Sequence, residues 1–471
     1  MRKMVLYALA VLGFVASCDK AEGIPGPAER TFPGIVETYV YSREVPWSRQ
    51  YDVTINGETQ RVIATAEPEI CIFGCTDTVE VRIAAIADRI ESVTVRPQGK
   101  NPVYRTDGNS IILQMTPYDR YDIEINGNED TPLFLFANPV DTAKPDRNNP
   151  NVVFFAAGEV YDAGTVTLKT GQTLYIEGGA IVNGMVSASG ADNIIIAGGG
   201  ILDGRKQNGK KVRLTECHNV TLKDLTVLGA TDWTTYLVKC DDIVADGYKA
   251  IATFSAKSDN SGNENDTFDL MACNHATIRR CFCYCHDDAY CIKTQKWLVS
   301  GTSTDITFED CIAWNKDCGN SFVVGYEVNQ DVSAVLFKDC HSIHSAGAAK
   351  PLRRAAVSIH NGAGGTLSDI RFENIHIEDP KESGIYIEII KSGYDIGNGV
   401  EWTPGHIRNV TLKDIHMGKI PPYGNVLSGY DDADHKIEGL VIDGVHIAGK
   451  RAGNLSECGP YTCKNTDITF K

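Results

Sequence analysis

Short runs of alternating hydrophobic and polar residues occupy the chain from about residue 35 to residue 140. The run YDVTINGETQRVIAT contains Asn56-Gly57 between its two halves, which predicts a β-hairpin with a two-residue turn. Further runs of this kind follow it: TVEVRIAAI, SVTVRP, SIILQM, RYDIEIN and PLFLFA. Short alternating strands between turn residues are typical of an all-β sandwich, which we therefore expect over residues 35–140. A segment rich in Pro, Asn and Asp, residues 137–151, marks its end.

A second pattern begins near residue 150 and continues to the end of the chain. Its members are variants of one short phrase: DNIIIAGGG, HNVTLKDLTV, DDIVADGYKAI, NHATIRRCFC, TDITFEDCIAW, SAVLFKDCHSI, SDIRFENIHIED, RNVTLKDIHMG, EGLVIDGVHI and TDITFK. The repeats lie 23 to 40 residues apart, with no helical periodicity between them. A β-strand repeat of this length predicts a solenoid, specifically a right-handed parallel β-helix over residues 150–471.

Alignment of the repeats shows an apolar column in which cysteine occupies three successive places. The column consists of Leu225, Tyr248, Cys281, Cys311, Cys340, Ile375, Ile415 and Val445. Equivalent positions of neighbouring coils stack about 4.8 Å apart, so this column should face the interior, with the cysteines as small buried hydrophobes. The next position holds His341, His376, His416 and His446. We expect these histidines to form a solvated row on the outer face, although metal binding there is an alternative.

The other cysteines raise the questions of a metal site and of disulfides. Cys281, Cys283 and Cys285 alternate along one predicted strand, which places them about 6.6 Å apart and disfavours convergence on one ion. We therefore expect no metal and no cofactor. We expect the segments CIFGC and CGPYTC to be short loops, so the best disulfide candidates in an exported chain are the pairs Cys71 with Cys75 and Cys458 with Cys463.

The N-terminus and the charge define the expected location and partners. MRKMVLYALAVLGFVASC has two basic residues, a short apolar run and small residues before Cys18, as in an export signal. VASC resembles a bacterial lipobox, which predicts a signal peptide over residues 1–17, lipidation of Cys18 and a flexible tether over residues 18–34. The alternative is a cleaved secretory peptide with an incidental cysteine.

We thus expect an exported protein anchored by lipid to a bacterial membrane, with the outer membrane favoured, in the periplasm or on the cell surface. A lipid anchor would be its only membrane contact. The formal net charge is −16, with 42% hydrophobic residues. This acidic balance disfavours nucleic acid as a partner because the long-range field would repel it.

Three aspartates of the repeat region are the candidates for a catalytic site. Asp266 lies 21 residues before Asp287, which Asp288 follows directly. Because 21 residues is close to one coil, Asp266 should lie on the rung beside the pair. Aspartates that only cap turns are common, but three carboxylates crowded on one patch repel one another, which favours a functional site.

These residues carry a resemblance to a known family. ENDTFDL … HDDAYCIKT resembles the NTDGFD … GDDCIAIK signature of glycoside hydrolase family 28, the polygalacturonases, with the same 21-residue spacing. DWTTYLVKCDDIVADGYKAI and GGGILDGR also resemble that family, so the likeness covers most of residues 150–380. The sandwich that precedes the helix is more similar to family 49, the dextranases and isopullulanases.

The resemblance implies an inverting hydrolase of O-glycosidic bonds in a polysaccharide or oligosaccharide. It implies that Asp287 is the general acid, and that Asp266 and Asp288 hold and deprotonate the attacking water. Asp269, which matches the second aspartate of the signature, is expected to support the turn.

The sequence departs from the polygalacturonase pattern at two cationic motifs. Residues 319–321 read Gly-Asn-Ser where the family has Gly-His-Gly, and residues 358–360 read Ser-Ile-His where it has Arg-x-Lys. A buried uronate needs a paired cation, so the loss of both favours a neutral, dextranase-like glycan. Arg353, Arg354 or Lys293 could replace them, which keeps a galacturonan hydrolase as the alternative. The candidate substrate-binding residues are Lys293, Asn320, Arg354 and His360.

Two other functions remain as alternatives. A β-helix polysaccharide lyase would need basic residues and usually calcium near a uronate, which the aspartate spacing fits less well. A catalytically inactive glycan-binding solenoid would have no need to keep all three aspartates, although fold alone proves no activity. Sugar-stacking candidates are Trp233, Tyr290, Trp297, Trp314, Tyr326 and Trp402. The loops at residues 257–265 and 391–404 should set endo or exo action, and the sandwich is expected to cap the helix end.

Overall fold

Nearly all regular structure in the computed structural model is β-strand, as the alternation and the repeats predict. The structure describes residues 32–65, 67–253, 265–295, 298, 300–345, 354–392 and 401–471. The predicted signal peptide and Cys18, together with Arg353, Trp297 and most of the two loops at 257–265 and 391–404, lie outside these residues. Within the described ranges, no helix has the length and hydropathy that crossing a membrane requires.

The N-terminal strands form two five-stranded sheets, which confirms the predicted sandwich. One sheet has the order β1-β4-β10-β9-β6 and the other β3-β2-β5-β8-β7. Asn56 and Gly57 have φ values of 47° and 86° and join β2 to β3 as predicted. The strands are β1 Val36–Thr38, β2 Tyr51–Ile55, β3 Glu58–Gln60, β4 Glu69–Cys75, β5 Val79–Ala85, β6 Val93–Arg96, β7 Tyr104–Asp107, β8 Ser110–Met115, β9 Arg120–Ile125 and β10 Leu133–Pro139, with the 3₁₀ helix η1 Gln98–Lys100 after β6.

The two predicted disulfides are wrong. Cys71 and Cys75 are free and buried, and both lie on β4 rather than in a loop. Four residues of extended strand separate them by about 13 Å, beyond the reach of a disulfide. Cys458 and Cys463 are also free, the first at the end of the 3₁₀ helix η2 Leu455–Cys458 and the second on β39.

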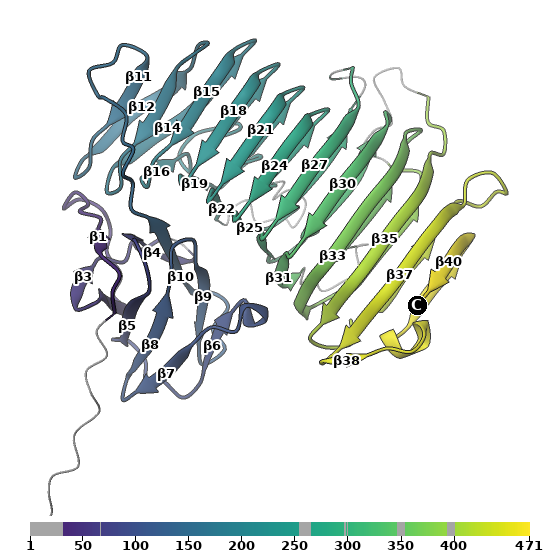
Figure 1. Cartoon of the computed structure of the whole chain (residues 1–471), viewed down its shortest axis with the longest axis horizontal. Coiled ribbons are helices and arrows are strands. Elements are labelled where there is room, and N and C mark those ends of the chain that lie inside the picture. Colours follow the sequence, from purple (N-terminus) through teal and green to yellow (C-terminus); the bar gives the residue numbers. More distant parts are fainter. Residues whose placement is uncertain are drawn as a thin grey trace, which may run out of the picture. The chain divides into compact units, whose positions relative to one another are not determined.

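The rest of the chain forms a 30-stranded sheet, β11 to β40, in which successive coils pair in parallel (Figure 1). The coils give three faces, which we name in the order the chain visits them. Parallel pairing through all three faces confirms the β-helix. On the first face the strands are β11 Val152–Phe155, β13 Thr173–Ile176, β15 Asp192–Ala197, β18 His218–Lys223, β21 Asp241–Asp246, β24 Asn274–Arg279, β27 Ser303–Glu309, β30 Val332–Lys338, β33 Thr366–Pro380, β35 His406–Met417, β37 Ile437–Ile447 and β40 Thr466–Phe470.

The long strands β33, β35 and β37 continue from the first face onto the second. The other strands of the second face are β16 Ile201–Asp203, β19 Thr226–Gly229, β22 Lys249–Ala252, β25 Phe282–Cys285, β28 Ile312–Asn315 and β31 His341–Ser345. The third face contains β17 Val212–Thr215, β20 Thr235–Val238, β23 Phe268–Met271, β26 Tyr290–Thr294, β29 Phe322–Val328, β32 Ala355–Asn361, β34 Ser383–Ile389, β36 Asn425–Ser428 and β39 Tyr461–Lys464. Strands β12 Val160–Thr167 and β14 Ile181–Ser189 run along the second and third faces. Strand β38 Lys450–Arg451 pairs antiparallel with β37.

The repeated phrase is explained by the bend between the first and second faces. The residue after β18, β27 and β30 is Asp224, Asp310 and Asp339, with φ between 51° and 58°. Aspartate and asparagine adopt this left-handed conformation more readily than most side chains. The aspartate of the repeated phrase therefore marks the point where the chain turns.

The interior column and the histidine row stack as the alignment predicts. The three column cysteines are free and buried in the main core, with Tyr248 below them and Ile375 above. The four histidine rings stack with centroids 4.6 to 4.8 Å apart. His341 is only 5% exposed, because Gly99 of the sandwich lies against it and His376. The row is thus not solvated along its whole length.

The sandwich packs along the second face rather than over the helix end, so the predicted cap is wrong. Phe134 and Phe136 of β10 lie with their ring centroids 4.9 and 5.1 Å from that of Phe282 on β25. Arg120 of β9 is 1% exposed and donates to the carbonyl oxygens of Cys281 and Asp310. This apolar contact and the buried arginine join the sandwich to the β-helix, so residues from Pro33 onward form one compact unit.

Candidate active site

The three aspartates meet where the chain passes from the second to the third face on neighbouring coils. Asp266 precedes β23, and Asp287 and Asp288 precede β26. The backbone N–H of Thr267 donates to the Asp288 carbonyl at 3.0 Å, which fixes the register between the two coils. As a result, an oxygen from each carboxylate lies within 4.8 Å of the others. The coil of about 21 residues thus places the aspartates together, as their spacing predicts.

The next coil brings a glycine directly beneath the aspartate pair. Gly319 has a φ of 78°, and a Cβ atom there would lie 2.1 Å from the Asp287 carbonyl carbon. Any side chain would therefore push the Asp287-Asp288 peptide away. The close approach of the two backbones therefore explains why the first residue of the 319–321 motif is glycine.

Asn320 holds Asp288. Its backbone N–H and its Nδ2 both donate to Asp288 Oδ1, at 2.7 and 2.8 Å. Its Oδ1 accepts from the N–H of Ala355 at 3.0 Å and from Ser358 Oγ at 2.7 Å. Asn320 is 1% exposed, so this predicted substrate-binding residue lies beneath the Asp288 carboxylate and orients it.

Lys293 on β26 is an internal cation of the site. Its Nζ lies 2.8 Å from Asp266 Oδ2, 3.5 Å from Asp269 Oδ1 and 3.8 Å from Glu327 Oε2. The side chain is 5% exposed, with Nζ 4.2 Å from the centroid of the Trp233 ring. Burial alone would lower the pKa of Lys293, but attraction to Asp266 and the other anions raises it well above its usual value. The positive charge of Lys293 is thus neutralised by carboxylates of the site itself.

The carboxylates differ in their affinity for a proton. Burial, followed by repulsion from Asp266 and Asp288, raises the pKa of Asp287 well above its ordinary value. Burial and Asp266 also raise the pKa of Asp288, to about 6, against the opposing effects of Lys293 and the two Asn320 hydrogen bonds. Both carboxyls therefore hold a proton more firmly than a free aspartate, and the two hydrogen bonds from Asn320 favour the ionised form of Asp288. Asp287 is also the only one of the three that is not fully buried.

The remaining predicted substrate-binding residues differ in exposure. His360 on β32 is 0% exposed, with Nδ1 3.0 Å from Glu388 Oε1 and Nε2 3.5 Å from Asn320 Oδ1. Arg354, which precedes β32, is partly exposed, and its charge lowers the pKa of Asp287. Among the described residues its buried Nη1 has no hydrogen-bond partner. Of the four predicted residues, Arg354 is thus the cation that acts on Asp287 without a carboxylate partner in the described part of the chain.

Three residues belong to the site although their part was not predicted from sequence. Glu327 on β29 and the fully buried Asp269 on β23 complete the carboxylate shell around Lys293. Burial and repulsion from Asp266 raise the pKa of Asp269 well above its usual value, and its Oδ1 lies 3.5 Å from Lys293 Nζ. Trp233 precedes β20, two coils before Lys293, and its ring centroid lies 4.2 Å from Lys293 Nζ. Assigning residues to coils and faces would have placed all three near Lys293.

The proposed stacking residues fall into two groups. Tyr290 and Trp314 are at most 1% exposed and are core residues, so neither offers a face to a sugar. Tyr326 stacks on His360 with centroids 4.1 Å apart, and Trp402 donates from Nε1 to the Gly362 carbonyl at 2.8 Å. Trp233, partly exposed beside Lys293, is the stacking candidate nearest to the aspartates.

The donor set is a poor match for a metal ion. The three carboxylates could converge on a cation, but Lys293 already occupies the position 2.8 Å from Asp266. A second positive centre would have to share those oxygens with the ammonium group. The site is better suited to proton transfer than to metal ligation.

A parallel β-helix with three carboxylates of unequal proton affinity at one turn defines a class of protein: the β-helical glycoside hydrolases. The comparisons agree with this class. The family model for Glycosyl hydrolases family 28 matches residues 155–466, which is most of the β-helix. The chain belongs to this family.

Two solved structures show the fold over different lengths of the chain. Dex49A from Penicillium minioluteum has a TM-score of 0.58 at 13% identity and covers 92% of this chain and 96% of its own. A hyperthermoactive exopolygalacturonase from Thermotoga maritima has a TM-score of 0.51 at 17% identity, covering 64% of this chain and 85% of its own. A search of curated proteins found no match. At these identities the two structures support the fold and leave the substrate open.

Proposed function

We propose that the protein is an exported glycoside hydrolase that cleaves O-glycosidic bonds of a polysaccharide or oligosaccharide with Asp287 as general acid. The observation that carries this proposal is the convergence of three carboxylates within 4.8 Å, in which burial and the other two aspartates raise the pKa of Asp287 while hydrogen bonds from Asn320 oppose the rise at Asp288. Hydrolysis of an acetal needs a proton donor for the leaving oxygen and a carboxylate that activates water.

In the proposed reaction Asp287 donates its proton to the glycosidic oxygen as the bond to the anomeric carbon breaks. Asp288, oriented by Asn320, and Asp266, paired with Lys293, hold a water molecule and take one of its protons as its oxygen attacks that carbon. Before the next cycle the ionised Asp287 regains a proton from solvent, and the carboxylate that accepted the proton of the water releases it. The fixed charge of Lys293 compensates Asp266 throughout.

Inversion of the anomeric carbon is part of the proposal and rests on the family resemblance. Carboxyl groups of inverting enzymes are usually about 6.5–9.5 Å apart to leave room for a water. Here the nearest oxygens of the three groups approach within 4.8 Å, which is closer to the spacing of retaining enzymes. The configuration of the first product therefore discriminates a direct attack by water from a route through a glycosyl-aspartate.

A neutral glycan is the favoured substrate. A uronate in the cleavage subsite would need a cation to pair with its carboxylate. Lys293 is enclosed by three carboxylates, and His360 is buried against Glu388. Among the described residues that were predicted to bind substrate, only Arg354 keeps an unpaired donor.

That donor supports the second candidate, a hydrolase of galacturonan. Arg354 lies close enough to Asp287 to lower its pKa, so a uronate bound there would be next to the scissile bond. A guanidinium group pairs well with a carboxylate. The Arg354→Gln substitution should abolish activity on galacturonan but change activity on a neutral glycan much less.

We also propose that the protein is lipidated at Cys18 and anchored to a bacterial membrane. The basic residues, apolar run and VASC sequence at the N-terminus support this proposal. Mass spectrometry of the mature N-terminus, with Cys18→Ala as the control, would detect the lipid. A mature chain that starts elsewhere, without lipid, would contradict it.

The proposed function is tested by release of reducing ends from a panel of neutral and uronic-acid polysaccharides. Wild type should release them from a neutral glycan, and Asp287→Asn should lose at least 1,000-fold of the rate. Activity only on galacturonan would select the second candidate. No release from any substrate, or an Asp287→Asn variant as active as wild type, would contradict the proposal, and an unsaturated product that absorbs ultraviolet light would identify a lyase.

A further inference from the structure

A buried histidine lies directly beside the proposed acid. His286 precedes Asp287 and is 1% exposed. Its Nδ1 is 2.5 Å from Asp317 Oδ2 in the β-helix, and its Nε2 is 2.7 Å from Glu67 Oε2. Glu67 belongs to the sandwich, between β3 and β4, and also accepts a hydrogen bond from the Tyr284 hydroxyl at 2.9 Å. Residues from both parts of the chain therefore converge on one imidazole.

The contacts identify the charge of this imidazole. Each ring nitrogen faces a carboxylate oxygen, so both nitrogens must carry a proton to satisfy the two contacts. Burial alone would lower the pKa of His286, but hydrogen bonds and attraction to Asp317 and Glu67 raise it above its ordinary value. His286 is thus an imidazolium held between two carboxylates.

The same residue also connects the two segments that carry the catalytic aspartates. The backbone N–H of His286 donates to Asn265 Oδ1 at 2.9 Å. Asn265 precedes Asp266, and His286 precedes Asp287 and Asp288. The ring of His286 is anchored to the sandwich while its backbone is tied to the Asp266 segment. Movement of this residue would shift all three carboxylates relative to one another.

We propose that Glu67 and His286 are positioning residues of the active site, through which the sandwich fixes the Asp287-Asp288 turn. The sandwich is then a structural part of the catalytic centre and not only a module that covers the second face. This inference rests on the proposed function for its catalytic consequence, because a displacement of well under 1 Å between acid and water can cost much of the rate. Its structural content, that Glu67 orders the turn, stands independently.

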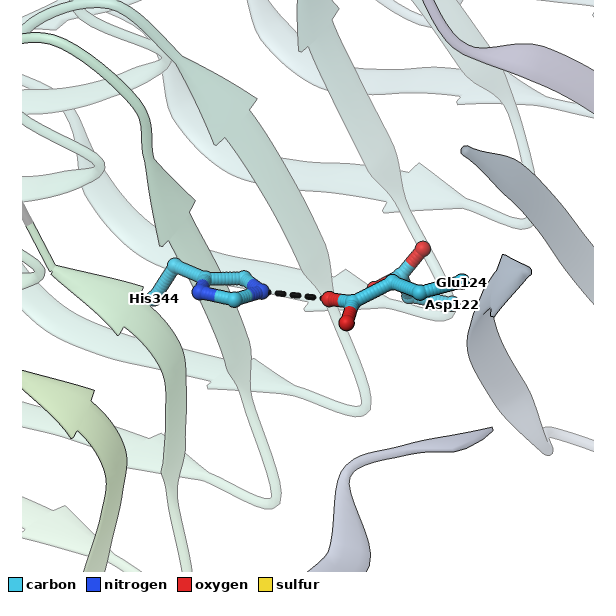
Figure 2. Close-up of side chains that lie close together, drawn as sticks. All are labelled: Asp122, Glu124 and His344. Atoms are coloured by element: carbon cyan, nitrogen blue, oxygen red, sulfur yellow. Dashed lines mark hydrogen bonds and ion pairs between the residues drawn. The ribbon is translucent and has the colours of Figure 1, made fainter. Parts of the chain in front are cut away.

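The structure also contains a matched control. His344 on β31 makes the same kind of bridge. Its Nε2 lies 2.5 Å from Glu124 Oε1 of the sandwich (Figure 2). Its Nδ1 lies 2.9 Å from Asp379 Oδ2 of the β-helix. It is also 1% exposed, and its two carboxylates raise its pKa. Neither carboxylate is one of the three catalytic aspartates. Loss of this bridge weakens the same packing without touching the turn.

The first test compares Glu67→Gln with Glu124→Gln on the glycan that wild type cleaves. Both changes are isosteric and remove one carboxylate charge from a bridged imidazolium. Glu67→Gln should lower kcat at least 10-fold with KM within twofold of wild type, whereas Glu124→Gln should keep the wild-type kcat. Asp317→Asn, which removes the other partner of His286, should reproduce the Glu67→Gln defect. Equal kcat in all variants, or equal losses for Glu67→Gln and Glu124→Gln, would overturn the proposal.

The second test needs no substrate, so it separates failure of this inference from failure of the proposed function. Hydrogen–deuterium exchange of the folded full-length chain should be faster in peptides covering residues 284–290 for Glu67→Gln than for wild type. In Glu124→Gln those peptides should exchange as in wild type. Unchanged exchange in Glu67→Gln overturns the inference even if the enzyme proves active. Faster exchange with an unchanged kcat also overturns it, because the ordering would then have no catalytic effect.

Discussion

Substitution of Asp288 by asparagine should remove activity and stabilise the fold. Asp288 is 7% exposed, and its Oδ1 accepts both hydrogen bonds from Asn320. An asparagine side chain has the same shape, and its Oδ1 can accept the same two bonds. The substitution therefore removes a buried charge and retains its hydrogen bonds. The charge that activity needs is also the one that destabilises the fold.

The size of the effect follows from the raised pKa. A carboxyl whose pKa rises from 3.8 to about 6 on folding destabilises the folded state, at a pH above 6, by about 3 kcal/mol relative to a neutral group. The sign follows from the proton: below pH 4 the group is protonated in both states and costs nothing, and the cost grows as pH rises through 6. For a cooperative unit of this length, 3 kcal/mol corresponds to about 3 °C in Tm.

Thermal denaturation at pH 7.5 and at pH 4, at one heating rate, measures this difference. Asp288→Asn should melt about 3 °C above wild type at pH 7.5 and with wild type at pH 4. The control is Asp305→Asn, an exposed carboxylate in a left-handed position that asparagine also adopts, which should not change Tm at either pH. A lower Tm for Asp288→Asn at pH 7.5, or a gain independent of pH, would refute the reasoning.

Three further predictions concern the same site. The rate kcat should rise with pH through about 6, because Asp288 must be ionised to accept a proton, and then fall as Asp287 loses its own; a flat profile from pH 4 to 7 would contradict this assignment. Lys293→Met should lower the free energy of unfolding by about 3–5 kcal/mol in denaturant titrations, since it leaves buried carboxylates unpaired; an unchanged value would show that Lys293 is dispensable. Proton NMR of the first product should show the anomer opposite to that of the substrate, whereas the same anomer would indicate a retaining reaction.

The β-helix could be predicted because the residues that repeat along the sequence are the apolar ones that face its interior. The repeated phrase places a left-handed residue, often aspartate, at the bend between the first and second faces, and the cysteine column reflects the stacking of equivalent positions. The strand β4 was mistaken for a loop because it is buried on both faces. Cys71 and Phe73 face the sandwich core while Ile70 and Ile72 face the β-helix, so no alternation is visible.

The site was only partly predictable. The spacing of Asp266 and Asp287 equals about one coil, so the sequence alone brings the three carboxylates together. The enclosure of Lys293 depends on which strand faces it, and neighbouring coils contribute Asp269 and Glu327. The contact between Glu67 and His286 joins residues 219 positions apart through the packing of the sandwich on the second face, which no local pattern encodes.

The most direct test of Asp287 as the acid is its dependence on the leaving group. The dinitrophenolate group of an aryl glycoside leaves without protonation, whereas a sugar leaving group needs a proton. With the glycan, Asp287→Asn should be at least 1,000-fold slower than wild type. With the dinitrophenyl glycoside of the same sugar, the loss should be less than 10-fold. Equal losses on both substrates would contradict the role of Asp287 as general acid.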